Sequence, residues 1–393
     1  MSPQRKLLYL LGTLAATFFL PLLGLYYFYG KIPDEFFHFP ATAPPVEGKP
    51  GPNIVAIIIT LLFWLAYILL IFFPRIYGFK KAELKDTETT IKHDQKFPLP
   101  AWFWVGLVLW GGIMFVFYAK VSTPKILVDW ALVPLWWGFI LMLDGIVYKR
   151  NGGQSLVRNA PAELVAMAIL SISGWMIFEY FNFFIGLNWY YPFAELIKEQ
   201  DTFLLYAFIG SSAFIPMAFE WYHFLRTIPA LNSKYRRGPR TEWPRFVKII
   251  LLFLAICALF YLSKNPDGLF YAIWLGPLII MITVMGWLGI WTPFTPIKQN
   301  GDWTVLVVFS LTWLLQGIFI EWWNHLSYQH HFVGTSNPGY WEYTLPFVDF
   351  YHVFNMPVLG YLGYVPFGIY CAIWFLAISY LMNIPSKFSF HHS

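Results

Sequence analysis

The sequence predicts an all-α integral membrane protein that crosses the bilayer about ten times. Of its 393 residues, 58% are hydrophobic and only 12% are charged, with a mean hydropathy of +0.55. Globular proteins carry roughly 25% charged residues, so a soluble domain is excluded. Apolar runs of about 20 residues can cross the hydrocarbon core as helices. Ten such runs lie at 6–29, 52–74, 98–119, 126–148, 162–186, 201–226, 245–263, 267–291, 302–326 and 357–382.

Lys and Arg gather in every second loop between these runs. The basic segments are Arg5 and Lys6, then 75–96, 149–158 and 226–248, whereas the loop between the last two runs has no Lys or Arg. Basic loops stay on the cytoplasmic side, so we expect cytoplasmic N- and C-termini. The net charge of +5 then reflects topology. We expect membrane lipids as partners and no nucleic acid, and a protein partner or a homo-oligomer is possible. We expect the protein to lie in the inner (plasma) membrane of a bacterium.

The chain divides into four predicted parts, two of which resemble each other. Residues 1–125 form a three-helix scaffold with a Pro-rich outer loop, 126–244 a first helical repeat, 245–266 a connecting helix and 267–393 a second repeat with a long outer loop. The spans at 126–226 and 267–382 share features at a nearly constant offset, since Glu179 and Glu321 are 142 positions apart, as are Asn182 and Asn324. We therefore predict parallel repeats related by an axis along the membrane normal.

A doubled polar motif ends the middle span of each repeat. Each copy places a carboxylate three residues before an amide, so both groups share one helical face. The second copy adds His325 one turn after Glu321. Ionisable groups inside a membrane are costly and mark function or a specific partner. The predicted catalytic residues are Glu179, Asn182, Glu321, Asn324 and His325.

Each motif is followed by a Trp-x-Tyr segment in the next outer loop. Aromatic residues make up 21% of the chain and crowd around these loops, more than interfacial belts require. Aromatic faces suit flat, polyunsaturated or cationic ligands. We predict that Trp189, Tyr191, Trp341, Glu342 and Tyr343 bind the substrate and form a lid.

Histidines near the second motif raise the question of a metal. His325, His330, His331 and His352 could supply ligands to a single transition metal at the outer site, with Glu321 beside them. Their spacing matches no specific zinc or iron signature, so the cofactor stays unknown.

Further carboxylates lie near the inner ends of two spans. Asp144 comes shortly before Lys149 and Arg150, which favours an ion pair at the headgroup level. Glu220 and His223 share a helical face near Arg226, and we expect a hydrogen-bonded pair there.

The pattern favours a membrane enzyme that acts on a lipid-soluble, isoprenoid-like substrate at the outer face, with the two glutamates as acid and base. The sequence contains no nucleotide-binding loop, nucleophile elbow or zinc-protease motif. Two alternatives remain: a proton- or cation-coupled transporter or channel, and a non-catalytic membrane subunit or assembly factor.

Overall fold

The computed structural model describes residues 2–38, 48–80, 97–121, 123–194, 197, 199–328, 337–386 and 388–390. The described chain is mostly helical, with only four two-residue strands. Eight of its helical segments are long and apolar enough to cross a membrane, namely Pro3–Tyr29, Ile54–Phe72, Ala101–Tyr118, Leu132–Arg150, Pro161–Gly186, Gln200–Arg226, Thr304–Tyr328 and Gly360–Met382. The chain is therefore a multi-pass, membrane-embedded protein of the all-α class.

The ten predicted runs all coincide with helices. They correspond to α1 (Pro3–Tyr29), α2 (Ile54–Phe72), α3 (Ala101–Tyr118), α4 (Lys125–Asp129) with α5 (Leu132–Arg150), α7 (Pro161–Phe181), α8 (Gln200–Ser211) with α9 (Phe214–Arg226), α11 (Arg245–Tyr261), α12 (Ala272–Trp287), α14 (Thr304–Tyr328) and α15 (Tyr364–Met382). α11 and α12 have 17 and 16 residues and fall short of the length of a full span. A count of ten crossings therefore stays a prediction.

Short elements connect these helices. They are the 3-10 turns η1 (Asp34–Phe37), η2 (Pro74–Tyr77) and η7 (Gly360–Gly363), the π-helical turn η4 (Asn182–Gly186), and the helices α6 (Leu156–Asn159), α10 (Pro229–Lys234) and α13 (Thr295–Asn300). The strands are β1 (Trp189–Tyr190), β2 (Glu342–Tyr343), β3 (His352–Val353) and β4 (Met356–Pro357). β1 pairs with β2 and β3 with β4, both antiparallel.

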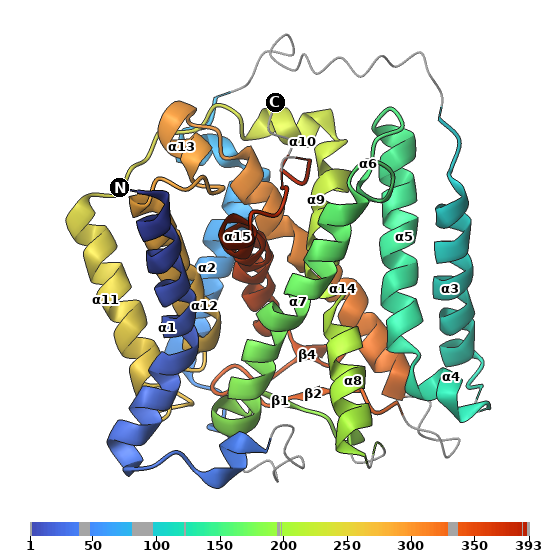
Figure 1. Ribbon diagram of the computed structural model, residues 1–393, viewed down its shortest axis with the longest axis horizontal. Helices are drawn as coiled ribbons and strands as arrows, with labels where there is room; N and C mark the ends of the chain where they lie inside the picture. Colours follow the sequence, from blue (N-terminus) through green and yellow to red (C-terminus); the bar gives the residue numbers. More distant parts are fainter. Residues whose placement is uncertain are drawn as a thin grey trace.

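The bundle has two distinct ends. Both chain termini lie at one end with α6, α10 and α13, which we call the terminal end, and the strands lie at the other, which we call the strand end (Figure 1). Termini on the same side require an even number of crossings. The terminal end carries those residues of the basic segments that the structure describes, among them Arg5, Lys6 and those of 149–158 and 226–248, so the positive-inside rule predicts that it faces the cytoplasm.

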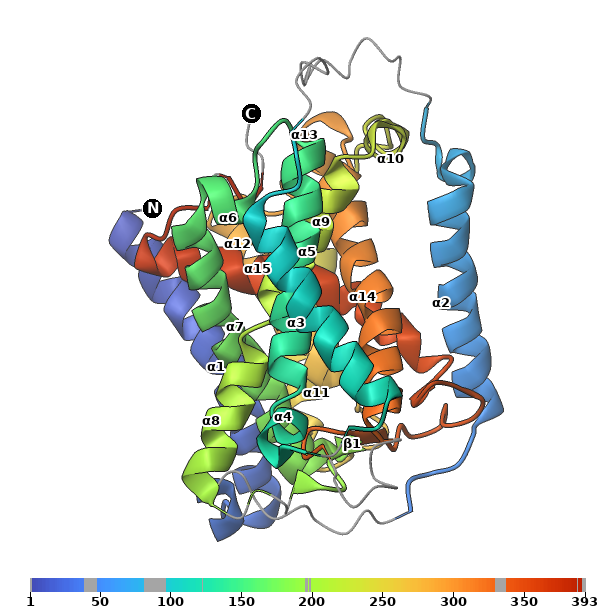
Figure 2. The ribbon, with the colours of Figure 1, turned by 90° about the vertical axis from the view of Figure 1, so that its right-hand side faces the viewer.

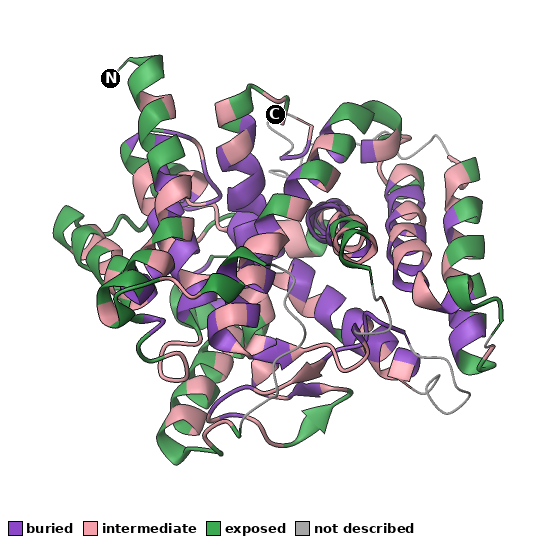
Figure 3. Ribbon diagram, turned by 60° about the horizontal axis from the view of Figure 1, so that its bottom comes forward, coloured by how far each residue is buried: buried purple, intermediate pink, exposed green. Residues whose placement is uncertain are grey.

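Buried residues gather in the interior of the bundle (Figure 3). Many of them belong to α7, α9, α14 and α15, which pack against one another. Close packing there depends on small residues: a Cβ added at Gly368 of α15 would lie 2.1 Å from the carbonyl oxygen of Phe309 on α14. Small residues of this kind let membrane helices approach without a hydrophobic driving force. The core positions the strand-end loops described below.

α2 stands apart from the bundle (Figure 2). None of its residues is buried. Its strand end is held by a hydrogen bond from the Asn53 N–H to the Phe347 carbonyl at 3.0 Å, and its other end by one from the Tyr235 hydroxyl to the Ile71 carbonyl at 2.8 Å. Between them, the hydroxyls of Tyr67 and Ser310 are 2.9 Å apart. α2 is thus fastened at both ends, with sparse contact along its length.

Candidate functional site

Glu179 is a buried carboxylate surrounded by three hydrogen-bond donors. It lies near the end of α7 and is only 6% exposed. Its Oε1 accepts from the Trp175 indole N–H at 2.7 Å and the Tyr191 hydroxyl at 2.5 Å, and its Oε2 accepts from the Trp189 indole N–H at 3.2 Å. Three donors stabilise the charged form of a buried carboxylate.

Asn182 holds the following loop against this carboxylate. Its Oδ1 accepts from the backbone N–H groups of Asn188 and Trp189 at 2.7 and 3.2 Å, and its Nδ2 donates to the Trp189 carbonyl at 2.7 Å. The chain can turn back this sharply because α7 ends in the π-helical turn η4 and Leu187 adopts a φ of 46°. Trp189 and Tyr191 are two residues apart in an extended segment, so both side chains reach the same side. The amide three residues after Glu179 therefore places two of that carboxylate's donors.

Glu321 on α14 has a similar but less complete set of partners. Its Oε1 accepts from the hydroxyls of Tyr343 and Tyr364 at 2.7 and 2.6 Å. The Trp341 indole also faces this carboxyl, but its N–H donates to the Tyr343 hydroxyl at 3.0 Å. Glu321 is fully buried, and its Oε2 accepts no hydrogen bond from the described residues. An unpaired buried oxygen of this kind is the natural place for a proton, because an unpaired buried charge is costly.

Asn324 repeats the role of Asn182. Its Nδ2 donates to the Trp341 carbonyl at 2.8 Å, and its Oδ1 accepts from the Trp341 N–H at 3.0 Å. In both copies the amide thus binds the backbone of the loop tryptophan, while the side chains of the Trp-x-Tyr segment turn toward the glutamate.

The two loops are joined directly through β1 and β2. The register pairs Trp189 with Tyr343 and Tyr190 with Glu342. Glu342 alternates with Tyr343 and accepts hydrogen bonds from the hydroxyls of Tyr190 and Tyr340, the latter at 3.1 Å. Burial, followed by this carboxylate, raises the pKa of Tyr190 to about 12. Glu342 therefore fastens the two loops together beside the site.

Tyr191 and Tyr343 each donate to the glutamate of their own motif. Burial raises the pKa of each hydroxyl well above its usual value, and the neighbouring glutamate raises it further, Glu179 for Tyr191 and Glu321 for Tyr343. Tyr343, from the second motif, also contributes to the raised pKa of Tyr191. Both therefore stay protonated and can donate to a carboxylate at neutral pH.

The copies also differ one turn before each glutamate, and the sequence analysis did not single out Trp175 or Tyr364, the two donors involved. Trp175 lies one turn before Glu179 and donates to it, whereas Gly317 lies one turn before Glu321. A Cβ at Gly317 would be 2.4 Å from the Tyr364 ring. The glycine thus leaves room for Tyr364 to supply the donor that Trp175 supplies in the first copy. The four-residue spacing of Trp175 and Glu179 could have predicted their contact on one helical face. No feature of the sequence near Glu321 predicts its contact with Tyr364, which comes from α15.

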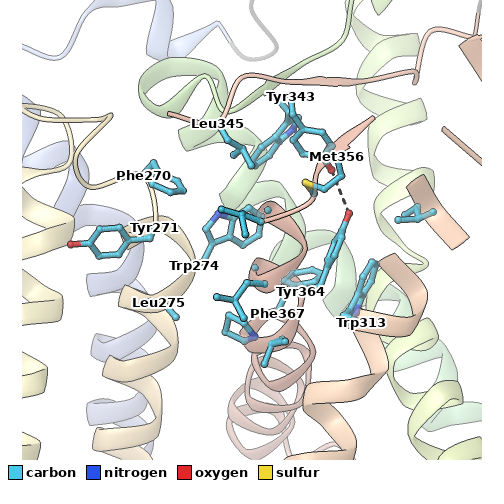
Figure 4. Close-up of a pocket in the computed structure, with 18 of the residues that line it drawn as sticks. Phe270, Tyr271, Trp274, Leu275, Trp313, Tyr343, Leu345, Met356, Tyr364 and Phe367 are labelled. Carbon is cyan, nitrogen blue, oxygen red and sulfur yellow. Dashed lines mark hydrogen bonds between the residues drawn. The ribbon is translucent and has the colours of Figure 1, made fainter. Parts of the chain in front are cut away.

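The motifs border a large cavity of about 1460 Å³ (Figure 4). Aromatic side chains form much of its wall, among them Trp274 and Phe367, and the hydroxyls of Tyr343 and Tyr364 lie 3.4 Å apart at its edge. Glu179 lines this cavity directly, together with Trp189, Tyr191, Trp341 and Tyr343. Glu321 lies behind Tyr343 and Tyr364. Four of the five predicted substrate-binding residues are therefore at the cavity, whereas Glu342 fastens the loops beside it.

The predicted metal ligands are not brought together among the described residues. His325 Nδ1 lies 3.2 Å from Asn355 Oδ1, and His352 Nε2 lies 2.8 Å from Asp349 Oδ1. His330 and His331 lie outside the described residues. No group of three metal-ligating side chains occurs in the part of the chain that is described. The metal site stays a prediction, as does a catalytic role for His325, which does not line the cavity.

A second pair of carboxyls lies toward the terminal end. Asp144 is fully buried and accepts from the Trp102 indole N–H at 2.8 Å and the Val157 N–H at 2.9 Å. The expected headgroup ion pair is wrong, because Asp144 faces into the bundle, whereas the Arg150 guanidinium lies 5.3 Å from the Phe224 ring centre. Glu220 is also fully buried, and its carboxyl lies against that of Asp144. Neither of its oxygens accepts a hydrogen bond from the described residues, so the expected hydrogen bond with His223 is wrong. Two charged carboxylates would repel each other at this buried position.

The chain was compared with protein-family models, curated proteins and solved structures, and none of them matches it.

Proposed function

We propose that this protein is an integral membrane enzyme that transfers protons to and from a lipid-soluble, isoprenoid-like substrate held in the central cavity. The observation that carries the proposal is a carboxylate, Glu179, on the wall of a large aromatic cavity, with a second buried carboxyl reached through two cavity-lining tyrosines. Groups so costly to bury in a membrane are retained where they do chemistry or bind a specific partner.

The different partners of the two carboxyls support different roles. Glu179, with three donors, is suited to remain charged and to accept a proton or stabilise a developing positive charge on the substrate. Glu321, with one oxygen lacking a partner among the described residues, is suited to hold a proton. In the proposed relay, the Glu321 carboxyl would rotate so that its protonated oxygen meets Tyr343 or Tyr364, which would give its own hydroxyl proton to the substrate and take up the one from Glu321.

Asn182 and Asn324 act as positioning residues in this proposal. Each fixes the backbone of the loop tryptophan, and through it the aromatic groups that meet the cavity. A displacement of about 1 Å in such a group can lower a reaction rate by about 100-fold. The strand end would then face the outer side of the membrane, as the basic loops predict.

The test is a comparison of lipid profiles from cells that express wild type, Glu179→Gln, Glu321→Gln or the control Glu242→Gln. Glu242 lies at the terminal end and pairs with Lys298 at 2.7 Å, far in sequence from both motifs. The proposal predicts that the amount of one lipid species changes, relative to cells without the protein, when wild type or Glu242→Gln is expressed. It predicts no such change with Glu179→Gln or Glu321→Gln. Unchanged lipids in every strain, with all proteins expressed equally, would refute it.

The same variants separate the alternatives. Ion or solute flux in proteoliposomes that is lost in Glu179→Gln, without any lipid conversion, would show a transporter. A fall in thermal stability without change in lipids or flux would indicate a structural role for the glutamates.

A further inference from the structure

The inward face of α2 forms one wall of the cavity. Its lining residues are Val55, Ala56, Ile59, Thr60, Phe63, Ala66, Tyr67 and Leu70. Their spacing of three and four residues defines a single helical face along the whole helix. The cavity therefore runs beside α2 from the strand end toward the terminal end.

Part of this inward face is as accessible as the face that looks away from the protein, since Val55, Ile59, Phe63 and Ala66 are exposed, whereas Ala56, Thr60, Tyr67 and Leu70 are half-buried. Ile59 and Phe63 on the lining face are 49% and 64% exposed, while Leu61 and Leu65 on the opposite face are 51% and 52% exposed. Side chains packed against a neighbouring helix would be largely covered instead. Within the described chain, an open cleft thus separates the exposed part of this face from α14 and α15. In the side view, the ribbon of α2 stands apart from these two helices (Figure 2).

The cleft continues into the site. Besides α2, its wall includes Trp313 of α14 and Tyr364 and Phe367 of α15, and Glu179 and Tyr343 line the same cavity. α2 has 19 residues, so it is about 28 Å long at about 1.5 Å per residue. That length is close to the hydrocarbon thickness of a bilayer, about 30 Å. A lipid chain lying along α2 would stay at membrane depth all the way to the motifs.

The charge of the lining restricts which lipids fit. Among the described residues that line the cavity there is no Lys, Arg or His, and Glu179 is the only carboxylate. A phosphate or diphosphate head group would be buried there without a cation and close to the negative charge of Glu179. Burying an unpaired charge in this way costs roughly several kcal/mol. The hydroxyls of Tyr191, Tyr343 and Tyr364 can instead bind a hydroxyl or carbonyl group, and the aromatic walls suit double bonds.

We infer that the cleft between α2 and α14–α15 admits an uncharged, unsaturated lipid sideways from the bilayer, and that the substrate carries no phosphate. This inference rests on the proposed function in treating the bound lipid as a substrate. The binding itself can be measured without any turnover. A phospholipid that occupies the cleft is the competing outcome.

The test uses tritiated geranylgeraniol, a neutral isoprenoid alcohol, in a scintillation proximity assay with the full chain in detergent. Unlabelled geranylgeraniol and geranylgeranyl diphosphate have the same chain and differ only in the head group, so they are matched competitors. We expect the diphosphate to compete at least about tenfold more weakly than the alcohol, a difference of about 1.4 kcal/mol. Equal or stronger competition by the diphosphate, or no binding of the alcohol, would overturn the inference.

Paired variants on α2 test the path. Ala66→Phe places a ring on the lining face, and Leu65→Phe places the same ring on the opposite face of the same turn. Because α2 has no buried residue, both variants are expected to fold, which gel filtration checks. The first should weaken geranylgeraniol binding at least about tenfold and the second should leave it unchanged. Equal effects would refute access along α2.

Failure of the inference and failure of the proposed function give different results. If the alcohol binds with the expected selectivity but no assay shows lipid conversion, the inference about the cleft stands and the proposed enzymatic function is refuted. If lipid conversion needs both glutamates but the diphosphate binds as well as the alcohol, the proposed enzymatic function stands and the inference of an uncharged substrate is refuted.

Discussion

Gly317→Ala tests whether the site depends on the Tyr364 donor. The new Cβ would lie 2.4 Å from Tyr364 Cδ2, about 1 Å inside the 3.4 Å at which ordinary van der Waals contact begins. The ring must move by about that much, which breaks its 2.6 Å hydrogen bond to Glu321. A hydrogen bond to a charged or strongly polar group contributes about 1.5–3 kcal/mol. Ala gains about 1 kcal/mol over Gly in a helix, so we expect a net loss of about 0.5–2 kcal/mol.

The assay is unfolding in mild detergent titrated with a denaturing detergent, followed by tryptophan fluorescence. Gly112→Ala on α3 is the matched control, because a Cβ there meets nothing within 4 Å and only the helical gain remains. In a Tyr364→Leu background the ring is absent, so Gly317→Ala should no longer destabilise. The reasoning is refuted if Gly317→Ala is as harmless as Gly112→Ala in the wild-type background.

Two further changes probe the loop contacts. Asn182→Ala leaves two buried N–H groups and a carbonyl without their partner, so the free energy of unfolding should fall by about 2–4 kcal/mol in the same assay; a change below 0.5 kcal/mol, roughly, would contradict the role of the amide. Glu342→Gln removes the carboxylate that helps burial to raise the pKa of Tyr190 to about 12, so that pKa should fall toward its usual value when followed by NMR of the labelled tyrosine ring. An unchanged pKa would show that burial alone sets it.

The membrane class and the placement of the motif residues could be predicted from the sequence because both depend on local patterns. Hydropathy over about 20 residues reports a span wherever it lies. Glu179, Asn182, Trp189 and Tyr191 lie within 13 residues of one another, so the chain between them is short enough for the motif to imply contact. The spacing of carboxylate and amide also predicts a shared helical face, and both amides do lie beside their glutamates.

Contacts made by distant segments could not be predicted in this way. Tyr364 reaches Glu321 from a different helix, 43 positions later, and Asp144 meets Glu220 across 76 positions. For Asp144, its basic neighbours in sequence suggested an ion pair, but the rotation of α5 turns the side chain toward α3 and α9. The cleft beside α2 has no sequence signal, because an apolar helix reads the same whether it faces protein or lipid.

The central claim is that the two glutamates move protons to a lipid in the cavity. The most direct measurement is mass spectrometry of lipids after incubating the purified protein with a membrane lipid extract in nanodiscs in D₂O. The account predicts that wild type and Glu242→Gln place deuterium on carbon of one neutral lipid, and that Glu179→Gln and Glu321→Gln do not. Deuterium in no lipid, or equal labelling by all four proteins, would contradict it.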